Sequence, residues 1–555
     1  MSYRQTQPQM PVWLEDIFIT IKDVYEWIAW FTLVFLAQQV VPFLFSYTPS
    51  SWPPLARYAL TAFYFGLPFI LLSRKVMRRI LRLILGAPVI FGQARFASYR
   101  ELRRAGLLRP GGRFMGQFVR GWFRRRAHDI SLHGEGHVLT IAAQGGGKTT
   151  GLIIPTLLTY TTGPVVVTDP KGAITAQTRR WRASLGRVVV LNPWRDELAA
   201  DPSFGLDLGD DGFNPLQGVN ATQDGMAVAR TVAALLSPDR PGEQSYWTSE
   251  ARSLLEWGML WLAVHRPKAC TLPRLHDLLF NTGELVKIME ACTTTVRDGP
   301  GIGALKKGAG KFYGMIDTGA GAQLSGIIGM ATAELAIYDE DTRLAAHVSR
   351  DGFRLADLKA GGPLTVFVIC PPDHLVGDDR KWLNLILSMI CQQVGKPGRA
   401  VETVLLMDEF PALGYLPNLA GALEQFREAG LRAHLIAQNP GQIITIYGAD
   451  GLRRFWGACE NKQFFRMTDP QQSAELSAWI GERQTKNYSY NPKGDESESY
   501  IGVPLIRPDE LLRMGPDRQI ILRAGLRPIA AHTLPFFKRP EWGRLVDPNP
   551  YRGQS

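Results

Sequence analysis

Cysteine is scarce in this chain of 555 residues. Only five are present, and no two of them form a CxxC pair. No cluster of cysteine and histidine occurs at metal-ligand spacing either. These absences exclude a disulfide-rich secreted scaffold and a zinc-finger type of site. We therefore interpret all five as buried, reduced thiols; they are Cys270, Cys292, Cys370, Cys391 and Cys459.

A net excess of positive charge is absent from most of the chain, although the overall net charge is +11. Residues 74–126 hold 15 basic residues and one acidic residue, a local charge of +14, which leaves about −3 for everything else. The overall charge therefore gives no argument for nucleic-acid binding. The basic stretch itself suits either anionic lipid headgroups or a phosphate-bearing partner.

Two long apolar runs stand out near the N-terminus. Residues 27–47 carry no charge over 21 positions, about the length that crosses a bilayer. A second run covers about 55–73, with Arg57 snorkelling to the surface. Five positive charges follow within nine residues from Arg74, and the positive-inside rule places that end in the cytoplasm. We predict a two-span transmembrane helical hairpin; a buried hairpin in a soluble protein is the alternative.

A glycine-rich loop follows a short apolar run at 137–143 and precedes an apolar segment that starts at Gly151. Such a strand–loop–helix context is typical of a phosphate loop, in which backbone N–H groups and a helix N-terminus bind phosphate oxygens. Lys148 would reach the β- and γ-phosphates of ATP, and the Thr149 hydroxyl would ligate Mg²⁺. The GxxxxGK[ST] pattern is broken at its first position, which is Ala142. The predicted nucleotide-binding residues are Gln144, Gly145, Gly146, Gly147, Lys148, Thr149 and Thr150.

An acidic pair ends a second apolar run. Residues 403–407 lead directly into Asp408 and Glu409, which is the Walker B form. Asp408 would hold Mg²⁺ through water, and Glu409 would act as general base on the attacking water. Taken alone, the pair could instead cap a strand or form a salt bridge.

Other runs are β-branched or apolar without alternation, as expected for parallel strands that are covered on both faces. They are 164–168, 187–191, 365–370, 432–437 and 462–467. Functional residues in such folds gather at strand C-terminal ends. Asp169 and Gln438 occupy such positions, and Gln438 could sense the γ-phosphate. We predict an α/β fold: a RecA-like P-loop domain with a parallel sheet.

Strand-like runs are absent from about 218 to 345, whereas 225–236 and 249–264 have helical periodicity. We predict an all-α insertion there, and loops at 206–212 and 484–499. The predicted parts are a membrane anchor at 1–85, the nucleotide-binding domain at 86–217 and 346–545, the insertion at 218–345 and a short tail at 546–555.

The chain resembles the type IV secretion coupling proteins, the TraG/TraD class of conjugation ATPases, which are related to the FtsK/HerA motors. The segment Leu405–Gly414, LLMDEFPALG, is the most specific. The resemblance is also carried by FGQARFA at 91–97, IPTLL at 154–158, DPKG at 169–172, FNPL at 213–216, CPPD at 370–373 and AQN at 437–439.

The resemblance implies a homo-hexameric ring at the bacterial inner membrane, with the body in the cytoplasm and the insertion selecting substrate. It nominates Arg427 as an arginine finger that completes a neighbour's site; from the residues alone, Arg427 is a charged helix position. The chain departs from the family's pattern in two ways. The turn between the two predicted spans is short, which weakens the case for a large periplasmic contact with the channel. The tail is short and is not acidic.

We therefore expect an ATP-hydrolysing, Mg²⁺-dependent motor that delivers a relaxase–DNA complex, effector proteins or both to a type IV secretion channel. Besides the channel, membrane lipid is an expected partner. Two alternatives stay open: a nucleotide-gated cargo receptor that does not pump, and an FtsK-like DNA translocase.

Overall fold

The computed structural model describes residues 92–552, apart from 121–125, 135, 239–244, 297 and 491–495, together with Pro53. Apart from Pro53, these residues all belong to one compact unit, Ile90–Ser555. The two runs predicted to span a membrane lie outside the described residues. Within the part of the chain that is described, none of the helices combines the length and the apolar character needed to cross a bilayer.

Seven neighbouring strands form a parallel sheet in the order β9-β3-β8-β7-β4-β6-β5. This confirms the predicted parallel sheet, strand by strand. The strands are β3 (Val138–Ile141), β4 (Val165–Thr168), β5 (Arg187–Leu191), β6 (Leu364–Val368), β7 (Thr403–Met407), β8 (Leu431–Ala437) and β9 (Asn461–Phe464).

Four further strands extend the sheet beyond β9 in antiparallel fashion, giving eleven in the order β2-β1-β13-β12 before β9. The sequence analysis did not find them, because they lack the continuous apolar character of the parallel strands. They are β1 (Arg113–Arg120), β2 (Arg126–Leu132), β12 (Arg518–Arg523) and β13 (Ile529–His532).

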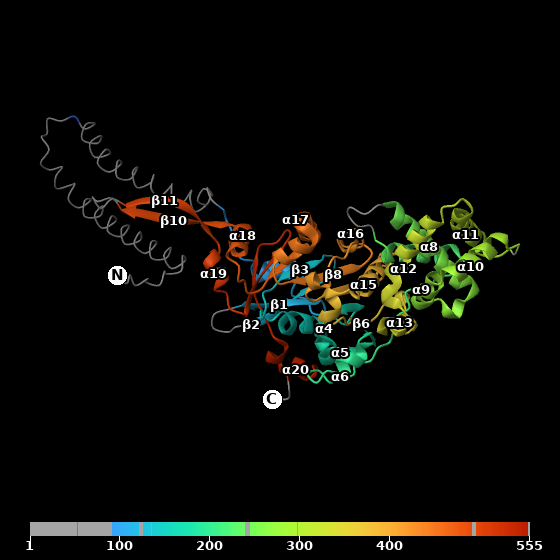
Figure 1. Cartoon of the computed structure of the whole chain (residues 1–555). Helices are drawn as coiled ribbons and strands as arrows, with labels where there is room; N and C mark the ends of the chain where they lie inside the picture. The colour runs from blue at the N-terminus through green and yellow to red at the C-terminus, as the bar shows by residue number, and fades with distance from the viewer. Residues whose placement is uncertain are drawn as a thin grey trace. The chain divides into compact units, whose positions relative to one another are not determined.

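A separate two-stranded ribbon corrects one prediction. The polar stretch 484–499 was expected to be a loop, but β10 (Glu482–Tyr490) and β11 (Glu496–Pro504) pair antiparallel along their whole length. Polarity suggested a loop, whereas the interleaved threonine, tyrosine, isoleucine and valine residues favour strands. The ribbon extends away from the main sheet (Figure 1).

Helices flank the large sheet. They are α3 (Tyr99–Arg104), α4 (Ile154–Thr159), α5 (Ala173–Leu185), α6 (Arg195–Ala200), α14 (Pro372–Val376), α15 (Arg380–Gly395), α16 (Leu419–Gln425), α17 (Pro440–Ala458), α18 (Pro470–Ile480), α19 (Pro508–Leu512) and α20 (Pro540–Gly543). Short 3-10 turns are η4 (Leu355–Lys359), η5 (Phe410–Leu413) and η6 (Phe536–Lys538), and η1 (Thr149–Ile153) is a π-helical turn.

Between β5 and β6 the described residues form helices and no strand. Those that follow α6 and precede η4 gather at one side of the sheet, away from the ribbon (Figure 1). They are α7 (Gln223–Leu236), α8 (Ser245–His265), α9 (Leu272–Phe280), α10 (Thr282–Thr294), α11 (Ile302–Asp317), α12 (Gly321–Leu335) and α13 (Arg343–Val348), with the 3-10 turns η2 (Pro267–Ala269) and η3 (Ala336–Tyr338).

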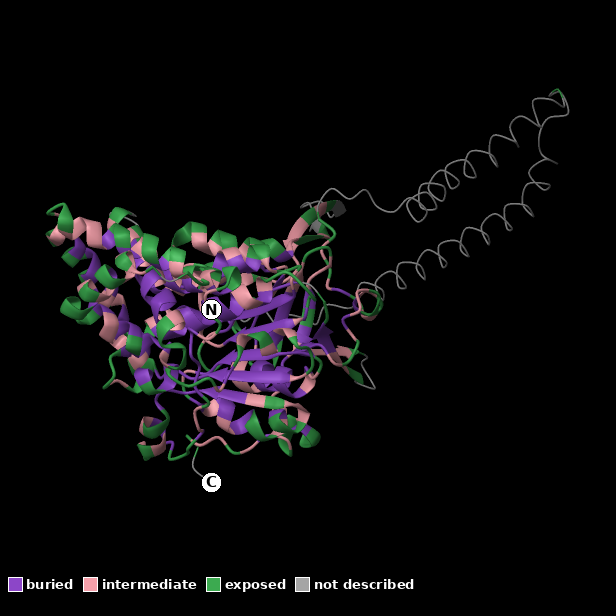
Figure 2. Cartoon of the chain, turned by 90° about the vertical axis from the view of Figure 1, so that its right-hand side faces the viewer, coloured by how far each residue is buried: buried purple, intermediate pink, exposed green. Residues whose placement is uncertain are grey.

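Both faces of the parallel strands are buried, which explains why their sequences do not alternate. In β4, Val166 belongs to the core cluster on one face, and Val165 and Val167 belong to the cluster on the other. The α15 residue Ile386 lies in the first cluster, and the α4 residue Leu157 lies in the second. Figure 2 shows the resulting buried layer of strands, with exposed residues on the outer faces of the helices.

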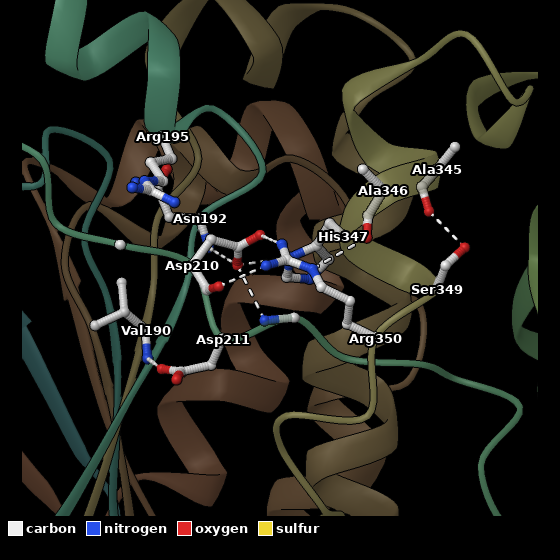
Figure 3. A network of polar contacts seen from close by, with 12 residues as sticks. Val190, Asn192, Arg195, Asp210, Asp211, Ala345, Ala346, His347, Ser349 and Arg350 are labelled. Carbon is white, nitrogen blue, oxygen red and sulfur yellow. Dashed lines mark hydrogen bonds and ion pairs between the residues drawn. The ribbon is translucent and has the colours of Figure 1, made fainter.

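A polar joint fixes α13 to the edge strand β5 (Figure 3). The carboxylate of Asp210 is 5% exposed and lies in a loop between them. It accepts from the backbone N–H of Asn192 at 3.0 Å, lies 2.8 Å from His347 Nδ1 and pairs with Arg350. Burial raises the pKa of Asp210, but His347 and Arg350 outweigh burial and lower it overall.

The neighbouring Asp211 completes this joint by pairing with β5 as a short extra strand would. Its backbone N–H donates to Val190 O at 2.8 Å, and its carboxylate accepts from the N–H of Val190 at 2.7 Å. Gly352 must be glycine here, because a Cβ would lie 1.9 Å from Asp211 O. The loop is thereby tied to the sheet on one side and to the helices on the other.

Removing the Asp210 carboxylate should destabilise the protein by about 3 kcal/mol, because Arg350 and His347 lose a buried partner. The measurement is the urea midpoint of Asp210→Ala, followed by tryptophan fluorescence. Asp207→Ala is the matched control, since Asp207 of the same loop forms an ion pair with Arg195 of α6 that is about half exposed and should contribute little to stability. Equal losses for the two variants would contradict a role for the buried joint.

Candidate functional site

The C-terminal ends of four adjacent parallel strands converge on one edge of the sheet. Ile141 of β3 pairs with Ala437 of β8, and Met407 of β7 pairs with Leu435 of β8 and with Thr168 of β4. The residues that follow these strands therefore emerge side by side. The glycine loop follows β3, Gln438 follows β8, the acidic pair follows β7 and Asp169 follows β4.

The glycine loop turns sharply between β3 and its helix. Gly145 and Gly147 have φ of 72° and 79°, a left-handed conformation that favours glycine. At Gly146 a Cβ would lie 2.9 Å from the backbone oxygen of Ala143. The loop ends at Lys148, where η1 begins and passes into α4. This leaves backbone N–H groups at a helix start, a geometry that suits phosphate oxygens.

Lys148 connects the glycine loop with the acidic pair. Its ammonium nitrogen lies 3.8 Å from Asp408 Oδ1 and 3.9 Å from Glu409 Oε2. The side chains of Lys148 and Asp408 are only about 15% exposed. The two segments, about 260 positions apart in the sequence, therefore meet in a partly desolvated site, where charge–charge interactions are stronger than in water.

Asp408 is a carboxylate of about 14% exposure without a full set of partners. Burial raises its pKa to about 6; Lys148 lowers it, while Glu409 and Asp169 raise it. Its Oδ1 atom is buried and accepts no hydrogen bond. A buried carboxylate oxygen without a donor is a natural ligand for a cation.

Glu409 is held in an unusual conformation. Among the described residues it is the one non-glycine residue with positive φ, at 52°. Its carboxylate accepts a hydrogen bond from the Gln438 side-chain amide, and the Gln438 backbone N–H donates to Gln442 Oε1 at 3.1 Å. Strained backbone of this kind occurs preferentially at functional sites.

Arg427 does not join the other predicted site residues. It is exposed and lies in the turn before β8 begins, whereas Gln438 follows the end of that strand. Seven strand residues span about 20 Å, so Arg427 and Lys148 of the same chain lie at opposite edges of the sheet. A contribution of Arg427 to this chain's own site is therefore ruled out by the topology.

The residues at this edge fit a magnesium ion bound together with nucleotide phosphates. Among the described residues, no group of three or more His, Cys, Asp or Glu side chains is arranged to hold a metal by itself. Mg²⁺ in phosphate sites takes most of its ligands from water and phosphate. The Thr149 hydroxyl and the Oδ1 atom of Asp408, which accepts no hydrogen bond, are the kinds of ligand atom that such an ion needs.

Sequence reasoning missed two features of the site. It placed Asp169 at a strand end without a partner, and the structure puts it next to Asp408; the DPKG segment was the available signal. Gln442 carried no signal, because its contact with Gln438 depends on how α17 begins.

The chain matches a family model described as type IV secretory system conjugative DNA transfer, over residues 95–550. It is 28% identical over 477 residues to the conjugal transfer protein TraG of Escherichia coli, covering 77% of this chain and 72% of that protein. It is 24% identical over 442 residues to the type IV secretion system-coupling protein VirD4 of Bartonella henselae, covering 76% and 66%.

Solved structures share the fold. The bacterial conjugative coupling protein TrwBdeltaN70, in complex with sulphate, has a TM-score of 0.55 at 18% identity, covering 81% of this chain and 96% of that chain. The plasmid coupling protein TrwB in complex with ADP and Mg²⁺ has a TM-score of 0.53 at 18% identity, with the same coverage. Because the family model spans most of the sequence, the chain belongs to the type IV secretory system conjugative DNA transfer family, the substrate-recruiting coupling proteins.

Proposed function

We propose that the protein binds Mg²⁺–ATP at the edge formed by β3, β8, β7 and β4, and hydrolyses it to drive substrate into a type IV secretion channel. One observation carries this: the Lys148 ammonium lies within 4 Å of carboxylate oxygens of both Asp408 and Glu409. A glycine loop joined in this way to an acidic pair is the arrangement that phosphoryl transfer to water requires. The ADP- and Mg²⁺-bound TrwB relative supports the choice of ligand.

Each side chain then has a defined task. Backbone N–H groups of 144–150 bind the phosphates, and Lys148 neutralises charge that develops on the γ-phosphate. Thr149 and Asp408 hold Mg²⁺, which supplies further charge neutralisation when bound. Glu409 accepts a proton from the attacking water, and Gln438 holds the Glu409 carboxylate in position until the γ-phosphate is in place.

Delivery requires more than the nucleotide site. We place the substrate contact on the helices between β5 and β6, and the active assembly is a homo-hexamer. The apolar runs near 27–47 and 55–73 anchor it in the bacterial inner membrane, with the body in the cytoplasm. The substrate is a relaxase–DNA complex, an effector protein or both. Stimulation of the ATPase of the detergent-solubilised protein by single- or double-stranded DNA distinguishes the first substrate from the second.

Lys148→Ala should lower ATP hydrolysis at least about 100-fold and abolish substrate transfer, because the γ-phosphate loses its cation. Glu409→Gln should retain nucleotide binding and lose hydrolysis to a similar extent. Lys396→Ala, an exposed lysine before the N-terminal end of β7, is the control and should behave as wild type. ATP hydrolysis is measured on the purified chain, and substrate transfer is measured in a mating assay. Wild-type transfer by the Glu409 variant would instead support a receptor that is gated by nucleotide and does not pump.

Asp408→Asn should stabilise the nucleotide-free protein while abolishing Mg²⁺-dependent binding. The folded-state pKa of about 6 lies above the unfolded value near 3.9, so the ionised wild-type residue costs stability at high pH. The gain in unfolding free energy should be about 1–3 kcal/mol at pH 8. It should shrink as the pH falls through about 6, where Asp408 takes up a proton. If the melting temperatures of Asp408→Asn and wild type differed by the same amount at pH 8 and at pH 5, a destabilising ionised Asp408 would be contradicted.

The position of Arg427 makes its proposed role one between subunits. Arg427→Ala should keep ATP binding and lose hydrolysis, because the transition-state charge loses a cation supplied by the neighbour. Mixing Arg427→Ala with Lys148→Ala chains should restore part of the activity, since some interfaces then pair an intact loop with an intact arginine. The measurement is the ATPase rate at fixed total protein. If mixing the two variants restored no ATPase activity, a role of Arg427 in the site of a neighbouring subunit would be excluded.

A further inference from the structure

A second carboxylate lies beside Asp408 at the candidate metal site. Thr168 of β4 pairs with Met407 of β7, so the next residues along, Asp169 and Asp408, are neighbours across the two strands. Paired residues on adjacent parallel strands lie about 5 Å apart and point to the same face. The Asp169 backbone continues the strand, since its N–H donates to Val368 O at 2.9 Å.

Asp169 is held rigidly at the start of α5. The residue is 2% exposed. Its Oδ2 atom accepts hydrogen bonds from both the backbone N–H and the hydroxyl of Thr175, at 2.7 and 2.8 Å. These bonds order the N-terminal turn of the helix and fix the carboxylate with respect to Asp408.

The two bonds from Thr175 do not by themselves explain the charge. An asparagine side-chain oxygen in place of Oδ2 would accept both of them. A second buried carboxylate next to Asp408 carries a desolvation cost and a repulsion. When no cation is bound, the negative charge of Asp169 lowers the stability of the fold, which a neutral side chain would not do.

A divalent cation would offset this desolvation and repulsion. With Asp169 included, the site combines three carboxylates with the ammonium of Lys148. We propose that Asp169 is a further member of the magnesium site, acting through the water shell of the ion and positioned by Thr175. This inference rests on the proposed function and deepens it. Action through water agrees with the absence, among the described residues, of a three-ligand metal cluster.

The test compares two variants of the full-length, detergent-solubilised chain by calorimetric titration with ADP at a series of Mg²⁺ concentrations. Asp169→Asn removes the charge and keeps an acceptor for Thr175. Thr175→Val removes one donor to Asp169 and keeps the charge. Loss of an outer-shell metal partner typically costs 10–100-fold in metal affinity. Asp169→Asn should therefore raise the half-saturating Mg²⁺ concentration about tenfold, without weakening ADP binding in EDTA.

Thr175→Val should lower the melting temperature and shift the Mg²⁺ curve less than Asp169→Asn does, because the backbone N–H of residue 175 still holds the charged carboxylate in place. The inference is overturned if Asp169→Asn gives the wild-type Mg²⁺ curve, if Thr175→Val shifts the curve as much, or if Asp169→Asn weakens ADP binding equally in EDTA. Wild-type protein that fails to bind ADP at any Mg²⁺ concentration would remove the proposed function itself, and this inference with it.

If Asp169→Asn does not fold, a structure of the wild-type chain with ADP and Mn²⁺ decides the question. A water bridge allows a carboxylate oxygen to lie no more than about 5 Å from the ion. An Asp169 oxygen within that distance supports the inference, and one well beyond it overturns the inference.

Discussion

The candidate site depends on four adjacent parallel strands whose C-terminal ends lie within two residues of one another in register. Because β3, β8, β7 and β4 are aligned in register, Lys148 meets Asp408 and Glu409 without any long side-chain reach. A shift of one residue in the register of β7 would turn Asp408 to the other face of the sheet. The apolar residues that fill both faces of these strands therefore determine the geometry of the polar residues beyond them.

The residues of this site lower the stability of the protein when no ligand is bound. Asp408 has a buried oxygen without a donor, Glu409 has a left-handed backbone, and Asp169 lies buried beside another acid. Each of these features lowers the stability of the empty fold, and each would be relieved or used once cation and phosphates are bound. Binding should accordingly stiffen the ends of the strands, so that the nucleotide completes the fold locally.

Much of this arrangement was predictable from sequence. The uninterrupted β-branched runs predicted the seven parallel strands, and the glycine loop and the acidic pair were identified by residue type and context. The antiparallel strands and the ribbon were not, since they lack continuous apolar runs and the ribbon is rich in the polar residues that are common in loops. The conformation of Glu409 and the position of Arg427 depend on backbone path and strand direction, which residue types do not encode. The sequence placed Asp169 at the end of a strand, but only the register of β4 and β7 places it beside Asp408.

The contact between Asp211 and Val190 has a consequence for how copies of the chain meet. β5 is the last strand of the large sheet, and a bare last strand invites another chain to add to it. Here the N–H and C=O of Val190 are both occupied by Asp211, partly through a carboxylate that imitates a neighbouring peptide. This rim of the sheet is thereby closed to strand addition at Val190. A copy of the chain that met this rim at Val190 would therefore contact side chains and could not add a strand there.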